Sequence, residues 1–305
     1  MSEIFVFSEN LALVGELIAL VHELEQTAIA IALSEAEARK ISQFGADKVT
    51  VLKGESLRPE DYAGPISELL SKRQPLAFFV GATASGRELA ARVAASRGVG
   101  LVNEALSVAI DEDTLQIRSL MYGGAVELEE RLNGLCVVSI PAGSAEAVAA
   151  AEKTGDLEII EVYVDQRVKR ISSEDIVYSG TDITLAKRLV CVGMGLNNKE
   201  DLKVAEDLAD SIQAELCCTR PISEDRGWME TATYIGLSGK VVKPDLLFEI
   251  GVSGQIQHTY GIRDAKIVAS INNKTDAMVF SVSDYGIVGD LYELVPLLTE
   301  ALKEA

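Results

Sequence analysis

Residues 188–218, RLVCVGMGLNNKEDLKVAEDLADSIQAELCC, carry the clearest fold signal in the chain. They read as a buried strand over 188–192, a Gly-Met-Gly turn at 193–195, a helix over 199–213 with apolar residues on one face, and a second strand over 214–218. Strand, Gly-x-Gly turn, helix and strand together are typical of a mononucleotide-binding unit in a parallel sheet. A third glycine at the fingerprint spacing does not follow, so the turn alone is weak evidence for a nucleotide site.

Strand-like and helix-like segments alternate ahead of this stretch. The predicted strands cover 4–7, 28–32, 48–52 and 76–80, and the predicted helices cover 11–25, 34–44, 60–73 and 88–97. Such alternation predicts a mostly parallel sheet with helices on both faces. Three more strands are expected at 115–120, 125–132 and 135–140, with Gly123-Gly124 as a hairpin signal.

Residues 158–184 carry mixed charge and little periodicity, which indicates an extended strand followed by a linker. We therefore predict an α/β fold of two Rossmann-like domains. The N-terminal α/β domain covers 1–185, and the C-terminal parallel-sheet domain covers 186–305.

Composition narrows the function classes. The 305 residues carry a formal net charge of −19, which argues against a nucleic-acid partner because phosphate binding depends on Lys and Arg. No apolar run is long enough to span a bilayer, and Met1-Ser2-Glu3-Ile4 lacks the basic flank of a signal peptide. We expect a cytoplasmic protein without membrane insertion.

Cysteine and histidine usage speaks against a metal site. The four cysteines show no C-x-x-C spacing, and the two histidines, His22 and His258, lie far apart in sequence. Buried free thiols are the expectation, and no metal ligand is predicted.

Polar residues follow each strand expected in the C-terminal half. They are Thr219-Arg220, 236–240, 251–258, Asn272-Asn273 and, after a strand expected over 277–282, Ser283-Asp284-Tyr285-Gly286. Carboxyl ends of parallel strands meet at one sheet edge, where ligands bind. The sequence therefore predicts a pocket for a large ligand with several chemically distinct parts.

The densest of these sets is Gly251-Val-Ser-Gly-Gln-Ile-Gln-His258, which follows the apolar run 246–250. Taken alone it is as consistent with an ordinary turn as with a ligand contact. A second glycine-rich loop, Gly81 to Gly86, resembles a phosphate loop without its Lys-Ser/Thr ending, and a tight turn with an N-cap is the preferred interpretation there.

Three motifs carry a family resemblance. The run 244–272, with Gly-Val-Ser-Gly-Gln-Ile-Gln-His and Ser-Ile-Asn, resembles the signature of the electron-transfer flavoprotein alpha subunit. Ser283-Asp-Tyr-Gly-Ile-Val-Gly-Asp290 is similar to the closing motif of that family. The similarity is most specific over 186–305 and continues more loosely through the N-terminal half.

The resemblance implies a flavoprotein of electron transport that forms a heterodimer with a beta subunit, on which the N-terminal domain packs. FAD is the implied cofactor, held by the C-terminal domain. It also implies the FAD-binding residues, which are Thr219, Arg220, Ile235, Gly236, Leu237, Ser238, Ser253, Gly254, Gln255, Ile256, Gln257, His258, Asn272, Asp290 and Leu291.

Within this set the resemblance assigns parts of the cofactor. Thr219 and Arg220 match the pair beside the flavin, and Ser238 matches the hydroxyl facing N5. Residues 253–258 match the run along the pyrophosphate, ribityl chain and pyrimidine edge, whereas Asn272 and Asp290-Leu291 match adenosine contacts.

Two cations in the set indicate how the flavin would be tuned. A guanidinium at Arg220 and an imidazole at His258 both favour negative charge on the ring and hence an anionic semiquinone. That state suits a carrier between a two-electron dehydrogenase and a one-electron acceptor. No catalytic nucleophile or general base is predicted, so the chain is expected to be an electron carrier rather than a self-contained enzyme.

The chain departs from the family pattern at two places. Met194 stands where the family has an arginine, and Leu237-Ser238 stands for a Gln-Thr pair. With Trp228-Met229-Glu230, these changes resemble the branch that serves anaerobic acyl-CoA or carnitine-type metabolism, so an acyl-CoA dehydrogenase-type or other redox partner is expected.

Three alternatives remain open at this stage. One is a nucleotide-binding regulatory module based on 81–86, without a redox role. Another is the alpha subunit of an electron-bifurcating, NADH-dependent complex. The third is an independent NAD-dependent dehydrogenase based on the 193–195 turn, which the incomplete fingerprint disfavours.

Overall fold

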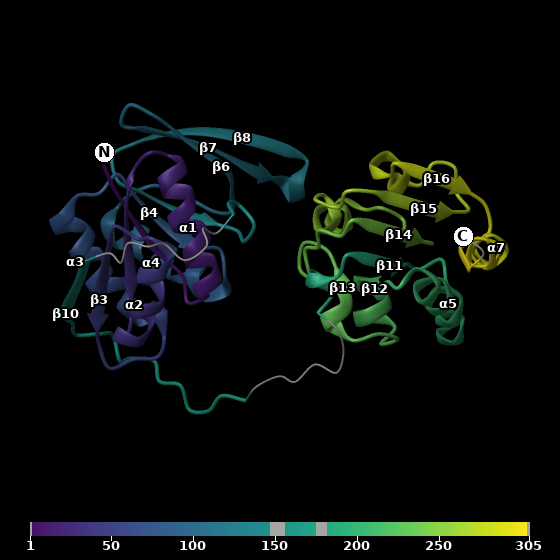
Figure 1. Cartoon of the computed structure of the whole chain (residues 1–305), viewed down its shortest axis with the longest axis horizontal. Helices are drawn as coiled ribbons and strands as arrows, with labels where there is room; N and C mark the ends of the chain where they lie inside the picture. Colours follow the sequence, from purple (N-terminus) through teal and green to yellow (C-terminus); the bar gives the residue numbers. More distant parts are fainter. Residues whose placement is uncertain (1, 147–155, 175–181, 304–305) are drawn as a thin grey trace. The chain divides into compact units, whose positions relative to one another are not determined.

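The computed structural model describes residues 2–146, 156–174 and 182–303. The chain forms two compact units, the first from residues up to 122 together with 126–173, and the second from 123–125 together with 174 onward. Figure 1 shows a sheet covered by helices in each unit. The domain boundary at residue 185 stays a prediction.

The first unit is built on a seven-stranded sheet of order β10-β3-β2-β1-β4-β9-β5, and every pairing in it is parallel. Its strands are β1 (Glu3–Phe7), β2 (Thr27–Ala32), β3 (Lys48–Lys53), β4 (Ala77–Gly81), β5 (Leu101–Val102), β9 (Cys136–Ile140) and β10 (Asp156–Glu161). Its helices are α1 (Leu11–Glu23), α2 (Glu35–Ile41), α3 (Ala63–Arg73) and α4 (Ala84–Arg97). The predicted alternation of strands and helices is confirmed.

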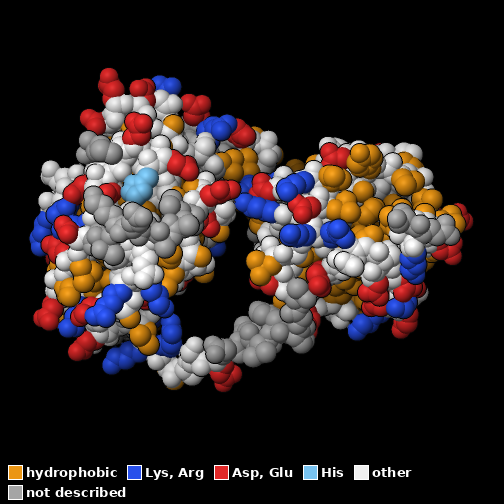
Figure 2. Space-filling model, viewed as in Figure 1, with side chains coloured by type: hydrophobic (Ala, Val, Ile, Leu, Met, Phe, Trp, Pro, Cys, Tyr) orange, Lys and Arg blue, Asp and Glu red, His pale blue; other side chains and the backbone are white. Residues whose placement is uncertain are grey.

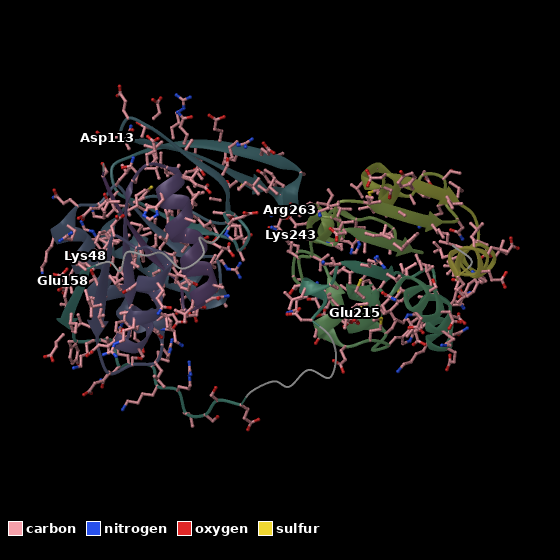
Figure 3. The ribbon with its side chains drawn as sticks, in the orientation of Figure 1. Lys48, Asp113, Glu158, Glu215, Lys243 and Arg263 are labelled. Atoms are coloured by element: carbon pink, nitrogen blue, oxygen red, sulfur yellow. The ribbon has the colours of Figure 1, made fainter. Side chains whose placement is uncertain are left out.

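Both faces of this sheet are buried. Ile4 and Val6 of β1 pack into one apolar cluster, and Phe5 and Phe7 pack into another on the opposite face. Each is at most 2% exposed, as expected for a parallel strand covered on both sides. At the outer edge, Lys48 of β3 lies 2.5 Å from Glu158 of β10, and Figure 3 labels both side chains.

A three-stranded antiparallel sheet interrupts the pattern. It consists of β6 (Ala105–Asp111), β7 (Thr114–Met121) and β8 (Val126–Asn133). Gly123 and Gly124 connect β7 and β8 with φ values of 69° and 95°, so the hairpin predicted there is confirmed.

The second unit is a six-stranded sheet of order β13-β12-β11-β14-β15-β16, again with parallel pairings. The strands are β11 (Arg188–Val192), β12 (Glu215–Thr219), β13 (Tyr234–Ile235), β14 (Leu246–Ile250), β15 (Val268–Asn272) and β16 (Tyr285–Val288). The helices are α5 (Leu202–Ile212), α6 (Ile256–Thr259) and α7 (Leu291–Lys303). The predicted Rossmann-like, parallel-sheet character is confirmed.

The two faces of this sheet are covered differently. On one face, α5 and α7 pack Leu208 and Val295 against Val190 and Val192 of β11. On the other face, Leu189 and Cys191 meet loop residues and short helical turns instead of a long helix. Glu249 of β14, the register partner of Cys191, belongs to this second face.

One expected strand is wrong. Residues 277–282 were predicted as a strand, but Met278–Val282 form a 3-10 helix and β16 begins only at Tyr285. The segment turns back over the loop that follows β14, where the amide of Val279 donates to the carbonyl of Ser253 at 3.2 Å. Its apolar residues therefore cap the core instead of pairing with β15.

The edge strand β16 is open on its outer side. Tyr285, Ile287 and Val288 are 67%, 47% and 51% exposed, and Figure 2 shows hydrophobic side chains over this part of the unit. Large exposed apolar patches are typical of interaction surfaces.

Across the described ranges, no helix combines the length and the apolar character that crossing a membrane requires.

Candidate functional site

The candidate site lies at the carboxyl edge of the second sheet. Strand order reverses direction between β11 and β14, which start the two halves of the sheet. Ligands of open α/β sheets bind in the crevice outside such a switch point. The loops that leave these two strands are Gly193–Gly195 and Gly251–Ser253.

Glycines let these two loops pack directly against each other. The amide of Gly195 donates to the carbonyl of Gly251 at 2.9 Å, and a Cβ on Gly195 would come within 2.6 Å of the Gly251 Cα. Gly251 itself adopts a φ of 62°, a conformation that favours glycine. The Gly-x-Gly turn thus forms part of a closely packed crevice floor.

A cavity of about 600 Å³ opens at this point. Its lining residues are Met194, Gly195, Asn197, Gly251, Ser253, Asn272, Asn273, Lys274, Asp276, Ala277, Met278, Asp290, Leu291 and Tyr292. Four of the residues predicted to bind FAD are among them, namely Ser253, Asn272, Asp290 and Leu291. The cavity lies within the size range of small-molecule and cofactor sites.

Two of these predicted residues also organise the cavity wall. The buried Asn272 donates from Nδ2 to the carbonyl of Val252 at 2.7 Å and accepts from the amide of Lys274 at 2.9 Å. Asp290 accepts from the amide of Tyr292 at 2.8 Å at the start of α7. The Asn272 contacts join the loops after β14 and β15, whereas the Asp290 contact lies within the start of α7.

Several cavity residues were missed by the sequence prediction. Lys274 brings a positive charge to the wall, and Asp276 brings a negative one. Tyr292 donates from its hydroxyl to Asp201 at 2.6 Å and accepts from the amide of Asn197 at 2.8 Å, which joins α7 to the loop after β11. Lys274 and Asp276 lie in the loop that follows a predicted strand, which was the signal that could have found them, whereas Tyr292 lies in α7 next to the predicted Leu291.

The remaining predicted residues form a second group beside β12 and β13. The amide of Leu237 donates to the carbonyl of Gln257 at 2.7 Å, which joins the loop after β13 to α6. Ser253, Gln255, Ile256 and Gln257 are exposed, whereas Gly254 is buried. The structure thus brings Ile235–Ser238 and Gln255–His258 together, although they are not among the residues lining the cavity.

Arg220 follows the last residue of β12, as predicted. Its side chain is 62% exposed, and Nε donates to Glu224 Oε2 at 2.6 Å across one turn. Thr219, the residue before it, is buried at the strand end. The guanidinium expected beside the flavin is therefore held by a neighbouring carboxylate.

His258 is buried, with 7% exposure. Its Nε2 lies 2.9 Å and 3.1 Å from the two carboxylate oxygens of Glu249, and its Nδ1 lies 3.3 Å from the carbonyl of Ile235. Burial lowers the pKa of His258, but attraction to Glu249 and the hydrogen bonds outweigh it, so the pKa is raised above 6.5. The sequence did not anticipate this carboxylate.

One cysteine, Cys191, lies next to this pair, and the four cysteines form no bridges. All four cysteines are buried free thiols, as expected. Burial raises the pKa of Cys136 and Cys218 to about 12 and that of Cys191 well above 9.0, which keeps these groups neutral. Cys191 lies close to Glu249 and His258, and ligand atoms of all three fall within 4.8 Å of one another.

The glycine-rich loop of the first unit does not offer a phosphate cradle. The amide of Ala82 donates to Ile140, that of Thr83 to Gly81, and that of Gly86 to the Thr83 side chain at 2.9 Å. Thr83 is the N-cap of α4, which begins at Ala84 and not at residue 88. The preferred interpretation, a tight turn with an N-cap, is confirmed.

The residues present at the sheet edge fit FAD. A crevice with a glycine floor, a lysine and two carboxylates on its wall, and an adjoining exposed polar loop suits a long ligand with a pyrophosphate and sugar hydroxyls.

Comparison with known proteins agrees with this site. The family model of the electron transfer flavoprotein FAD-binding domain matches residues 182–263, and that of the electron transfer flavoprotein domain matches residues 13–166. The C-terminal FAD-binding character predicted from the sequence is thereby confirmed.

Full-length relatives point the same way. An electron transfer flavoprotein subunit of Escherichia coli K12, YdiR, is 34% identical over 99% of this chain and 98% of its own length. The FixB proteins of Salmonella typhimurium LT2 and Shigella flexneri are each 31% identical over the same shares of both chains. The chain therefore belongs to the electron transfer flavoprotein family, as a subunit of the alpha type with its FAD-binding domain in the C-terminal half.

Proposed function

We propose that this chain is the FAD-holding subunit of a heterodimeric electron carrier, completed by a beta subunit. The observation that carries the proposal is the cavity at the switch point between β11 and β14. The loops that leave these two strands lie inside residues 182–263, which match the FAD-binding family model. The exposed apolar residues of β16 are consistent with an additional protein surface that covers them.

Bound FAD would supply the capacity to take up electrons as a pair and release them singly. The chain's own part is binding and electrostatics. Lys274 offers a cation to the pyrophosphate, and Asp276 and Asp290 offer acceptors to sugar hydroxyls. Asn272 keeps the loops around them in place.

The predicted contacts divide between two regions in this proposal. Ser253, Asn272, Asp290 and Leu291 hold the adenosine half in the cavity. The adjoining group, made of Thr219, Arg220, Ile235–Ser238 and Gly254–His258, borders the flavin half.

The partner and the electron chemistry are finer parts of the proposal. We expect an acyl-CoA dehydrogenase-type donor and electron transfer through the anionic one-electron form of the flavin. Trp228-Met229-Glu230 and the altered turn at Met194 are the sequence features that suggest the acyl-CoA branch. An NADH-dependent bifurcating complex is the alternative, and oxidation of NADH by the heterodimer would favour it.

Co-expression with a beta-type subunit tests the proposal. The expected product is a yellow heterodimer with equimolar FAD that passes electrons to an artificial one-electron acceptor. A complex that assembles but stays colourless after FAD is added would contradict the proposal. Turnover of NADH by this chain alone would instead favour an independent dehydrogenase.

A further inference from the structure

Glu249 is a carboxylate inside an apolar sheet. It lies in β14 between Phe248 and Ile250 and is 1% exposed. Its register neighbours are Cys191 of β11 and Ser270 of β15. A buried charge in such a position is strongly unfavourable unless a partner satisfies it.

The partner is His258, which reaches Glu249 from α6. Nε2 lies within hydrogen-bonding distance of both carboxylate oxygens, at 2.9 Å and 3.1 Å. The other ring nitrogen, Nδ1, faces the carbonyl of Ile235 at 3.3 Å. A carbonyl oxygen can only accept, so Nδ1 must carry a proton.

The second ring proton follows from the carboxylate. An ionised Glu249 accepts but cannot donate, so Nε2 must carry a proton as well. A neutral ring would direct a lone pair at a buried negative charge. An ionised Glu249 opposite Nε2, together with the carbonyl opposite Nδ1, therefore selects the doubly protonated imidazolium.

The other groups that meet the pair are neutral or already satisfied. Cys191 is a buried thiol with a pKa well above 9.0. The hydroxyl of Ser270 is hydrogen-bonded to that of Ser283 at 2.6 Å. Among the described groups around it, His258 is thus the cation that balances Glu249.

The pair also joins the core to two loops of the candidate site. His258 ends the exposed polar run that begins at Ser253, and the preceding Gln257 accepts the amide of Leu237. Glu249 anchors both loops through a single ring. Loss of the anchor would free the ring to rotate and would loosen the contact to β13.

We propose that Glu249 is a positioning residue that fixes the orientation of the His258 ring and holds it doubly protonated, so that an ion pair rather than a lone cation borders the flavin. The part that concerns the flavin rests on the proposed function. The pairing itself does not.

Nitrogen NMR of histidine-labelled heterodimer tests the pairing. The signals that disappear in a His258→Asn complex identify the ring. Near neutral pH both ring nitrogens should show shifts of the protonated type. An unprotonated Nε2 in the native protein would overturn the proposal without any variant at Glu249.

Glu249→Gln then removes the charge and keeps the size. The pKa of His258 should fall by about one to three units, because burial is no longer opposed by a negative partner. Glu249→Asp should restore part of the shift, and it serves as the second variant if the glutamine form does not fold. An unchanged pKa of His258 in the folded Glu249→Gln form, which lacks the charge, would overturn the proposal.

The flavin potential tests the second part. In the native complex, the reduction potential of the flavin should change with pH along a single slope across the neutral range. In Glu249→Gln, this slope should change at the new pKa of His258. The matched control is Asp47→Asn, since Asp47 pairs with the other histidine, His22, at 3.2 Å on the surface of the first unit.

The two failures can be told apart. One outcome is that both His258 nitrogens are protonated in the native complex, but the plot of flavin potential against pH shows no break in Glu249→Gln. That outcome would overturn the flavin part of the proposal. Protonated nitrogens in a complex that never binds FAD would overturn the proposed function and leave the pairing intact.

Discussion

Nε2 of His258 lies 2.9 Å from Oε1 of Glu249 in the interior of the second unit. Arg220, the other cation expected beside the flavin, is joined to Glu224 at 2.6 Å. Both positive groups predicted to favour a reduced, anionic flavin are therefore matched by carboxylates. Under the proposed function, the tuning of the flavin would depend on these partners as much as on the cations.

The first prediction concerns stability against pH. The folded pKa of His258 is raised above 6.5, so its pairing stabilises the protein fully below that pH and loses its contribution as the pH rises through the folded pKa. Glu249→Gln should cost about 3 kcal/mol in free energy of unfolding at acidic pH and clearly less at alkaline pH.

Fluorescence of Trp228 is the measurement, because it is the single tryptophan of the chain and packs in the second unit. Denaturant unfolding is followed at about pH 6 and at about pH 9. An equal loss at both pH values would show that the pair is not ionised in the folded protein.

The second prediction concerns charge in the cavity. Met194 and Lys274 both line it, and Met194 stands where the family has an arginine. Lys274→Ala should weaken FAD binding by about fivefold, since an exposed cation contributes about 1 kcal/mol. Met194→Arg in the same background should recover the loss.

Titration of apo-heterodimer with FAD measures both variants. Lys243→Ala is a suitable control because Lys243 belongs to the same unit and does not line the cavity. If Lys274→Ala binds FAD as tightly as the control, the pyrophosphate does not lie beside Lys274.

The third prediction concerns the loop after β14. Gly254 has a φ of 76°, and a Cβ there would lie 2.1 Å from the amide nitrogen of Val279. Gly227 has a similar φ of 61° in open space. Gly254→Ala should therefore cost about 2 kcal/mol more than Gly227→Ala and should empty the FAD site.

Thermal unfolding and FAD content of the two purified complexes provide the comparison. Equal losses in both would mean that backbone strain alone matters and that the close approach of the two loops does not. Full FAD content in Gly254→Ala would show that this loop does not form part of the FAD site.

The fourth prediction concerns Arg220. Arg220→Ala should lower the flavin potential or reduce FAD content, because a charge-assisted contact contributes about 1.5–3 kcal/mol. Glu224→Gln should act in the opposite direction, because it releases the guanidinium from its partner. Spectroelectrochemistry measures the flavin potential of both variants. An unchanged potential and an unchanged FAD content in both would show that Arg220 does not contact the flavin.

The regular elements were well predicted where the pattern reflects burial. The run 246–250 is buried on both faces and matches β14 residue for residue. The run 277–282 has similar composition but forms a 3-10 helix, because its environment is the end of the core and not a neighbouring strand. Local composition cannot separate these two cases.

The candidate site was predicted only in part, because some of its contacts depend on tertiary structure. Polar residues after strands identified the sheet edge, and family motifs supplied the residues. Lys274 and Tyr292 carry no motif. Lys274 enters the cavity from the loop after β15, and Tyr292 enters it from the first turn of α7. The Glu249–His258 pair depends on strand register and on the path of α6, which joins residues nine positions apart in sequence.

We propose that this chain holds FAD as an electron carrier and favours its anionic form. Stepwise anaerobic reduction of the purified heterodimer, followed by absorption spectroscopy, tests it most directly. A red, anionic one-electron form should accumulate before full reduction. A blue, neutral form, or direct two-electron bleaching with no intermediate, would contradict it.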